Sequence, residues 1–499
     1  MYQLVRIGFI VLFSMIILSF AQAQQRAWCG TTTEPSKWTE DYLQNRSAYP
    51  KSNEVLYVPL TIHLVGTDAG TGHLAVKTLL DAICKLNEDY ASSNIQFYIF
   101  GNIRYINRTS LYEDKGQIYG RSTHTQNRVI NTVNIYVVEN AGEEDESVTL
   151  GYATGIGGDG LVIIKSEVNR TSTTLPHEIG HVLGLYHTFY GWEGYEHNYT
   201  LNAPTVVNSN RKVERVDGTN CTGSGDGFCD TGPDYLSNGP WACDRTGQST
   251  TAQKDPAGSS FRSDGSNFMS YSSTACQSGF SGDQSQAMRT HLTSAKRNML
   301  NRTAPLPVVD NIPVTLVSPL NSVPVNFSAI NIRWNAVPGA TTYLLEVSRV
   351  ASFAGSFTTS YLLTSNETTL TDLAAGRAYF WRVKAFNAFS FCGNSSSVGK
   401  FQATSTTPVT EIEGNGTFNI YPNLLSPNQT VTIEANLIES TRLNIRLFDT
   451  SGRLLQSNEY EAIAGENTLR FNPNNISKGI YILNITTNRG TLVERLVIQ

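Results

Sequence analysis

The order of apolar and polar positions predicts two kinds of structure along the chain. Apolar and polar residues alternate over residues 54–66, which predicts a strand, and residues 73–90 have the apolar spacing of an amphipathic helix. Further strands are expected at 95–106, 129–138 and 161–164, and further helices at 175–187 and 281–300. Ser281 and Gln284 stand in capping-box relation at the start of the last helix. This series predicts an α/β domain with a twisted mixed sheet.

Beyond a proline-rich and polar stretch at 301–313, which reads as a linker, helical periodicity disappears. Short strands separated by Gly, Pro, Asn and Ser turns fill residues 314–406, with bulky residues at Trp334, Tyr343, Leu370, Tyr379 and Trp381. These positions suit the inward face of a β-sandwich, and the module at 312–406 resembles a fibronectin type III domain. Residues 418–499 again consist of strands and turns, so two all-β modules are expected after the α/β domain.

Composition favours an extracellular protein of several domains. The chain has 499 residues, which predicts two to four domains, and only 16% of them are charged. The net charge of -5 comes without a basic stripe, which argues against nucleic acid as a partner. Nothing in the composition requires an oligomer, and we expect a monomer.

The N-terminus predicts export. An apolar run follows Arg6 and ends before the small-x-small pattern at 21–23, so residues 1–23 read as a signal peptide. The alternative, a membrane anchor, needs a longer run of about 20 residues. Residues 24–53 are polar without a sustained period, and we interpret them as a pro-segment or an ordered leader.

One short segment carries the candidate chemistry. His177 and His181 are four residues apart, so on a helix they share a face and can direct two imidazoles at one metal ion. Gly184 tolerates the positive φ that ends a helix, which lets His187 approach the same ion from another direction. Three ligands of this kind predict a zinc site with one position left for water, and Glu178 is placed to act as the general base.

A second signature lies downstream. Met269 and Tyr271 occur in Asn-Phe-Met-Ser-Tyr, which matches the Met-turn that lies under the zinc in metzincins. Met269 is expected to form an apolar floor beneath the imidazoles. Tyr271 is expected to donate a hydrogen bond to the oxyanion that develops at a scissile carbonyl.

The extended motif at 177–189, the Gly-Asp-Gly-Phe-Cys-Asp-Thr block at 225–231 and the Met-turn resemble the pappalysin family of metzincins. The resemblance implies a zinc endopeptidase domain over residues 54–303 that acts on proteins or peptides, usually with bound calcium. Asp226, Asp230 and Thr231 are the calcium ligands that it suggests. Relatives that cleave before arginine have an acid where this chain has Thr274, so an arginine preference is not implied.

The chain has seven cysteines, an odd number, so at least one is left without a partner. From their positions along the chain, together with the family resemblance, we expect two disulfide bonds, Cys221–Cys229 and Cys243–Cys276. Cys29 resembles a cysteine switch, in which a pro-segment thiolate takes the fourth zinc position and keeps the enzyme latent. The alternative is a free or disulfide-bonded leader cysteine. Cys84 is expected to be inert core, and Cys392 has no assigned partner.

The last module, 418–499, resembles the C-terminal sorting domain of type IX secretion. The resemblance rests on Asn-Ile-Tyr-Pro-Asn at 419–423, Asp-Thr-Ser-Gly at 449–452 and Ser-Lys-Gly-Ile-Tyr at 477–481, whereas Leu424 departs from it. It implies the outer-membrane secretion machinery as a partner and a secreted or bacterial cell-surface location. The alternative is a generic β-sandwich.

Three functions remain open from the sequence. A latent secreted zinc endopeptidase uses every motif. A cell-surface adhesion protein with a non-catalytic metalloprotease-like scaffold would explain the two β modules, but it gives no reason for the intact Glu178. Zinc-dependent hydrolysis of a non-peptide amide would share the metal site but gives no reason for the Met-turn.

Overall fold

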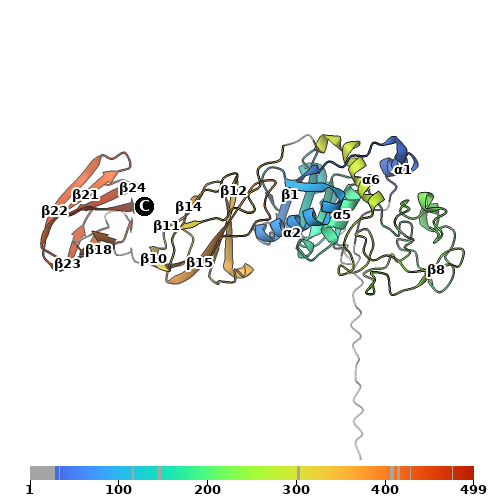
Figure 1. The fold of residues 1–499 in the computed structure, drawn as a ribbon. Coiled ribbons are helices and arrows are strands. Elements are labelled where there is room, and N and C mark those ends of the chain that lie inside the picture. The colour runs from blue at the N-terminus through green and yellow to red at the C-terminus, as the bar shows by residue number, and fades with distance from the viewer. Residues whose placement is uncertain are drawn as a thin grey trace, which may run out of the picture. The chain divides into compact units, whose positions relative to one another are not determined.

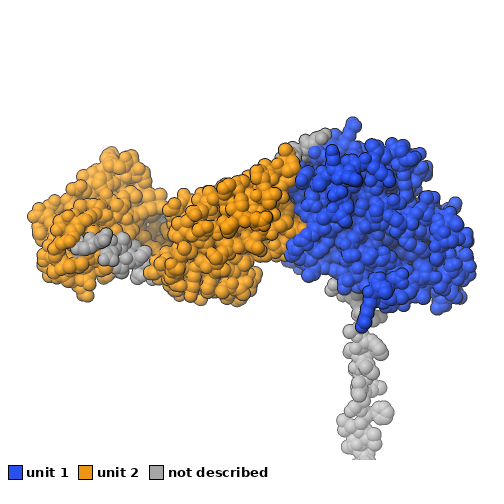
Figure 2. All heavy atoms as spheres, in the orientation of Figure 1, with its two compact units in different colours: residues 1–74, 85–302 blue, residues 75–84, 303–499 orange. Residues whose placement is uncertain are grey.

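The structure is a computed structural model that describes residues 29–32, 34–114, 117–142, 149–300, 304–404, 410–412, 416–426, 429–474 and 476–498. The expected signal peptide at 1–23 lies outside these residues. The chain divides into two compact units, coloured separately in Figure 2. Unit 1 comprises Met1–Leu74 and Lys85–Arg302, and unit 2 comprises Ala75–Cys84 and Thr303–Gln499.

Unit 1 is built on a mixed sheet with the strand order β2-β1-β4-β6-β5, and β3 also pairs with β1. The strands are β1 (Leu56–Gly66), β2 (Ile95–Ile99), β3 (Arg104–Asn107), β4 (Val133–Val138), β5 (Gly151–Ala153) and β6 (Gly160–Ile164). All neighbours run parallel except β5, which is antiparallel to β6 at the sheet edge. Nearly every residue of β1 and β4 is buried, as expected for parallel strands covered on both faces.

The α-helices are α1 (Lys37–Gln44), α2 (Val76–Asp89), α3 (Thr109–Tyr112), α4 (Ile118–Asn127), α5 (Thr174–Val182) and α6 (Gly282–Thr293). A two-stranded ribbon of β7 (Gln253–Lys254) and β8 (Ser260–Phe261) belongs to the long loops between α5 and α6. Helix α5 packs against β5 and β6. Figure 1 shows α5 and β1 in the same α/β part of the chain. Within the described residues no helix is long and apolar enough to cross a membrane.

Several predicted elements differ in their bounds. The strand expected at 95–106 is two strands, because the chain turns through Gly101 at φ 70 between β2 and β3. The helix expected at 281–300 has the capping box of Ser281 and Gln284 but ends at Thr293. Helix α5 stops at Val182 rather than continuing to 187.

The leader has more structure than its sequence pattern indicates. Helix α1 begins at an N-cap, Ser36, whose hydroxyl accepts a hydrogen bond from the Thr39 amide. Tyr42 is buried, and the Trp38 ring lies 4.4 Å from the ring of His291 in α6. The polar stretch therefore contains a helix that packs within unit 1.

Unit 2 contains two β modules. In the first, one sheet has the order β10-β16-β15-β12-β13 and the other β14-β11-β9. The strands are β9 (Leu316–Ser318), β10 (Val323–Asn326), β11 (Ile330–Trp334), β12 (Thr342–Ser348), β13 (Thr358–Leu363), β14 (Glu367–Leu370), β15 (Arg377–Phe386) and β16 (Gly399–Thr404). The five bulky residues singled out from the sequence all belong to the buried core of this module.

The second β module also has two sheets, with orders β17-β18-β20-β23 and β19-β25-β24-β21-β22. Its strands are β17 (Thr410–Ile412), β18 (Gly416–Tyr421), β19 (Leu424–Leu425), β20 (Val431–Leu437), β21 (Thr441–Asp449), β22 (Leu454–Ala462), β23 (Gly465–Phe471), β24 (Gly479–Thr486) and β25 (Thr491–Ile498). Alternate residues of β20 and β21 are buried, so each strand presents one face to the module's core.

The expectation for Cys84 is wrong, and Cys392 now has a partner. The two form a disulfide with their Cα atoms 5.5 Å apart, across a sequence separation of 308 residues. Cys84 is indeed buried on α2, but a buried thiol within bonding distance of another in an exported protein forms a crosslink rather than staying an inert core residue.

Candidate metal centre

Helix α5 and the turn after it place three histidines. His177 and His181 lie one turn apart on the same face of the helix. Gly184 follows with φ 96, and the Leu185 amide donates to the Gly180 carbonyl over 3.0 Å, which ends the helix. A Cβ on Gly184 would lie 3.2 Å from the Trp38 ring, so the turn has little room for a side chain. The chain then returns with His187 toward the two helical histidines.

The three imidazoles converge through their Nε2 atoms. Nε2 of His181 lies 3.2 Å from Nε2 of His177 and 3.1 Å from Nε2 of His187. Nitrogen ligands about 2.0–2.1 Å from a tetrahedral zinc ion lie roughly 3.3–3.4 Å apart. The arrangement therefore fits a zinc ion held by three nitrogens.

Each histidine is oriented through its other ring nitrogen. Nδ1 of His177 lies 2.7 Å from the Phe268 carbonyl oxygen, and Nδ1 of His181 lies 2.9 Å from the Leu185 carbonyl oxygen. Nδ1 of His187 lies 3.0 Å from Oε1 of Glu193. With the proton on Nδ1 each ring donates to these oxygens and leaves Nε2 free to bind a metal.

Burial keeps the helical histidines neutral. It lowers the pKa of His177 to about 3 and also lowers the pKa of His181, in both cases with help from the neighbouring histidines. A neutral imidazole is the form that binds a metal ion. Both rings are therefore in the ligand form throughout the neutral pH range.

Glu178 is buried beside the histidines and contacts the leader. Its Oε2 accepts a hydrogen bond from the Thr31 hydroxyl over 3.0 Å, while the Thr31 oxygen accepts from the Ala153 amide over 2.8 Å. Its other oxygen, Oε1, is buried and makes no hydrogen bond within the part of the chain that the structure describes. Burial raises the pKa of Glu178 to about 8. The carboxyl group can therefore both take up and release a proton near neutral pH.

Cys29 lies with the three histidines. Its Sγ and one ring nitrogen from each histidine are all within 4.8 Å of one another, the single such cluster of three or more possible metal ligands among the described residues. Cys29 forms a parallel β-bridge with Gly151, and the Gly30 amide donates to the Gly151 carbonyl over 2.9 Å. The leader thus adds to the edge strand β5. Burial, and then the charge of Glu178, raise the pKa of the Cys29 thiol more than the hydrogen bonds from Thr31 lower it, and a nearby cation would favour its thiolate.

Met269 and Tyr271 also lie close to the cluster. Met269 is fully buried, and a Cβ placed on Gly180 would come 2.4 Å from its sulfur, so the methionine lies directly against α5. The Tyr271 ring lies 5.0 Å from the His187 ring, and its hydroxyl donates to the Cys29 carbonyl over 3.3 Å. Met269 therefore packs against the histidine helix and Tyr271 lies beside His187, while their roles stay predictions.

The suggested calcium ligands are only partly brought together. Oδ1 of Asp226 accepts hydrogen bonds from the Thr231 hydroxyl and the Phe228 amide, each over 2.9 Å. The Asp230 carboxylate instead accepts from Ser281 and from the Asp283 amide at the start of α6. Donors of the protein occupy these oxygens, and calcium stays a prediction.

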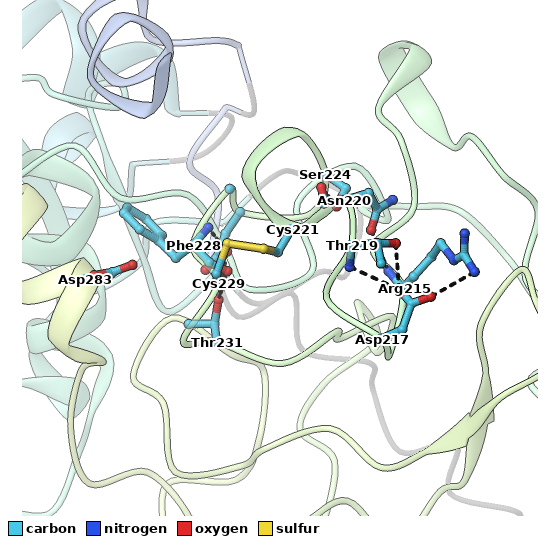
Figure 3. The surroundings of a disulfide bond; sticks show 12 residues. Arg215, Asp217, Thr219, Asn220, Cys221, Ser224, Phe228, Cys229, Thr231 and Asp283 are labelled. Carbon is cyan, nitrogen blue, oxygen red and sulfur yellow. Dashed lines mark hydrogen bonds and ion pairs between the residues drawn. A yellow bond between two sulfur atoms is a disulfide. The ribbon is translucent and has the colours of Figure 1, made fainter. Parts of the chain in front are cut away.

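Two disulfides fix the loops around this region. Figure 3 shows Cys221 bonded to Cys229 close to Thr231, with their Cα atoms 5.1 Å apart. Cys243 is bonded to Cys276 with a Cα separation of 6.1 Å. Both pairs correspond to those expected from the sequence. Cys29 is the remaining cysteine, and its thiol is free.

Sequence reasoning missed two residues of this site, Glu193 and Thr31. Glu193 follows His187 by six residues, and no motif marks it. Thr31 follows Cys29 by two residues, so in an extended leader the two side chains point to the same face. That alternation was the one signal that could have found Thr31.

Comparison with known proteins adds two findings. Residues 419–499 match the family described as secretion system C-terminal sorting domain. An extracellular metalloprotease of Colletotrichum graminicola is 27% identical over 314 residues, which are 56% of this chain and 96% of the relative. An extracellular metalloprotease of Pyricularia oryzae is 26% identical over 250 residues, 47% of this chain and 74% of the relative.

Among solved structures, the chicken CNTN1 FN1-FN3 domains match with a TM-score of 0.19 and 13% identity over 38% of this chain and 69% of theirs, a likeness too slight to support an argument. The sorting domain and the extracellular relatives together identify the chain as a secreted or cell-surface protein.

Proposed function

We propose that the chain is a secreted zinc endopeptidase of the metzincin kind, most similar to pappalysins, whose leader keeps it latent. The observation that carries this proposal is the convergence of three histidines, in which Nε2 of His181 lies within 3.2 Å of Nε2 of His177 and of His187, beside a buried glutamate. The relatives named extracellular metalloproteases support it. The mixed sheet with its antiparallel edge strand next to the histidine helix also suits a metzincin-like catalytic domain over residues 54–303.

The residues divide the chemistry among them. His177, His181 and His187 would hold zinc, which when bound supplies a Lewis acid that lowers the pKa of water to about 7. Glu178 accepts the proton of the attacking water and delivers it to the leaving amine, a task for which a carboxyl with a raised pKa is suited. The Tyr271 hydroxyl donates a hydrogen bond to the developing oxyanion.

The leader makes the enzyme latent in this proposal. Cys29 would supply a thiolate as the fourth zinc ligand, as in a cysteine switch. The same segment lies along the edge of β5, where an extended peptide substrate would otherwise add as a strand. Removal of the leader therefore frees the zinc and the sheet edge together.

The remaining modules serve export and presentation. Residues 418–499 direct the chain to the type IX secretion machinery of the outer membrane. The module at 312–406 is a fibronectin type III-like spacer, and protein or peptide substrates are the partners of the catalytic domain. Calcium at Asp226, Asp230 and Thr231 remains part of the proposal as a structural ion.

The competing proposal is an adhesion protein with an inactive metalloprotease scaffold. It is not favoured, because Glu178 is retained, buried and contacted by a leader residue next to Cys29. A scaffold without catalysis has no need for a leader that contacts the general base.

Proteolysis of denatured casein by the leader-trimmed protein tests the proposal. We expect activity that a zinc chelator abolishes and added zinc restores, together with one zinc ion per chain. Glu178→Ala should keep its zinc and lose at least about 10²–10⁴-fold in kcat, the usual contribution of a general base. Casein cleavage by Glu178→Ala at the wild-type rate, or a trimmed wild type that holds zinc and cleaves nothing, would overturn it.

A further inference from the structure

The third histidine lacks the support that the other two receive. His177 and His181 are part of α5, whereas His187 follows the last helical residue, Val182, by five positions. The Phe189 ring stacks on the His187 ring at 4.6 Å with an interplanar angle of 11°. Stacking fixes the plane of the ring, but it leaves open which edge faces the metal and which nitrogen carries the proton. Another contact must settle both.

Glu193 makes that contact. Its Oε1 lies 3.0 Å from Nδ1 of His187, and its Oε2 accepts from the Gly191 amide over 2.7 Å. The Glu193 carbonyl in turn accepts from the Asn208 side chain over 2.7 Å. Because Nδ1–H and the Gly191 N–H are both donors, the bridging side chain needs two acceptor oxygens, which a carboxylate has and an amide does not.

The turn at Gly191 holds the bridge in place. Gly191 has φ 97, a conformation that favours glycine, and a Cβ there would lie 2.9 Å from the Arg211 side chain. The turn brings an acid six residues downstream of His187 back to the ring. Glu193 is half-buried, so its charge is only partly screened by water.

Glu193 also differs in charge from the partners of the other two rings. Those are the neutral carbonyl oxygens of Phe268 and Leu185. An anionic acceptor on Nδ1–H increases the basicity of Nε2 more than a carbonyl does, and it places a negative charge close to the bound cation. The ligand that is least constrained by the backbone thus has the strongest orienting partner.

We propose, on the basis of the function proposed above, that Glu193 is a positioning residue which fixes the tautomer and orientation of His187 and strengthens zinc binding. It touches neither substrate nor metal and acts through the imidazole alone. Once the leader is removed, the zinc site therefore depends on four residues, the three histidine ligands and the carboxylate that holds the third.

Zinc competition against a chromogenic chelator tests this proposal on the full secreted chain. We expect Glu193→Ala to weaken zinc binding about 10- to 100-fold, the usual loss for an outer hydrogen-bond partner. The zinc affinity of Glu193→Gln should lie between those of wild type and Glu193→Ala. Its amide oxygen can accept a hydrogen bond from His187, but its NH₂ group then faces the Gly191 N–H, and two donors cannot bond to each other. Glu196→Gln, an exposed carboxylate on the same loop, should bind zinc like wild type.

The thermal unfolding midpoint of the zinc-free proteins separates positioning from folding. We expect zinc-free Glu193→Gln to unfold at the wild-type temperature while its zinc affinity falls. Wild-type zinc affinity in both Glu193 variants, with His187→Ala strongly impaired, would overturn this inference and leave the proposed function intact. A wild-type chain that binds no stoichiometric zinc would overturn both.

Discussion

The hydroxyl of Thr31 donates a hydrogen bond to Oε2 of Glu178 over 3.0 Å, so the leader contacts the candidate general base as well as the metal cluster. Cys29, two residues earlier, lies with the three histidines. One extended segment therefore meets both halves of the proposed chemistry. Latency should accordingly depend on two side chains rather than on the thiol alone.

The first prediction concerns this pair of contacts. Cys29→Ala should shorten the lag before the secreted precursor processes itself, because zinc loses its fourth protein ligand. Thr31→Val should shorten it further in the Cys29→Ala background, since a hydrogen bond typically contributes about 0.5–1.5 kcal/mol, roughly 2- to 10-fold in the balance between closed and open leader. A time course of precursor loss on gels measures both.

Thr32→Val is the matched control, because Thr32 is exposed and one position out of phase with Thr31. We expect it to behave like wild type. Unchanged latency in the Cys29→Ala, Thr31→Val double variant would show that other parts of the leader hold the site closed.

The sequence predicted the parts of the site that depend on local geometry. His177 and His181 share a face because any helix brings residues four apart together, and Gly184 ends that helix because few other residues adopt φ 96. The strand β1 and the capping box of α6 likewise depend on short-range patterns. These features needed no knowledge of the tertiary fold.

The missed features depend on tertiary contacts. Helix α1 has 8 residues and too few apolar positions to be stable alone. It is stabilised by the packing of Trp38 and Tyr42 in unit 1, which the sequence pattern does not show. Edge strand β5 has 3 residues, too few to show alternation. Cys84 and Cys392 are 308 residues apart, and nothing in either neighbourhood indicates the other.

The second prediction concerns Tyr271 after the leader is removed. Its hydroxyl donates to a leader carbonyl, at Cys29, and removal of the leader takes this acceptor away, so that an oxyanion can replace it. Tyr271→Phe keeps the ring that packs against His187, so zinc content should not change. We expect kcat to fall about 10²–10³-fold, the usual cost of losing an oxyanion donor, with KM little affected. An unchanged kcat would remove Tyr271 from the proposed chemistry.

The third prediction uses a buried acid near the suggested calcium loop. Burial, followed by the charges of Asp226 and Asp234, raises the pKa of Glu214 to about 9. The same carboxyl in the unfolded chain titrates near about 4.3. Between about pH 4.3 and 9 the unfolded state releases the proton first, so stability is highest below this window and falls as pH rises through it.

Urea unfolding midpoints measured from pH 5 to 9 in calcium-free buffer check the sign. Glu214→Gln cannot ionise, so we expect a flatter pH dependence and greater stability than wild type at pH 8. Calcium bound at Asp226 would favour its ionised form, and added calcium should then raise stability most at high pH. If the urea midpoints of wild type and Glu214→Gln changed with pH in the same way, the role of Glu214 would be contradicted. If added calcium did not change the midpoints, the calcium site would be contradicted.

The last prediction follows from the covalent link between Cys84 and Cys392. Residues 304–308 are exposed and lie between these cysteines in sequence, so a site-specific protease sequence placed there allows the chain to be cut in its linker. On a denaturing gel without reductant the cut protein should run as one species, and with reductant as two, because the disulfide alone joins the fragments. Cys392→Ser should give two species under both conditions. Two species from the unreduced wild type would contradict the crosslink. The expected result would mean that a cut in the linker during maturation leaves the first β module covalently attached to the proposed protease.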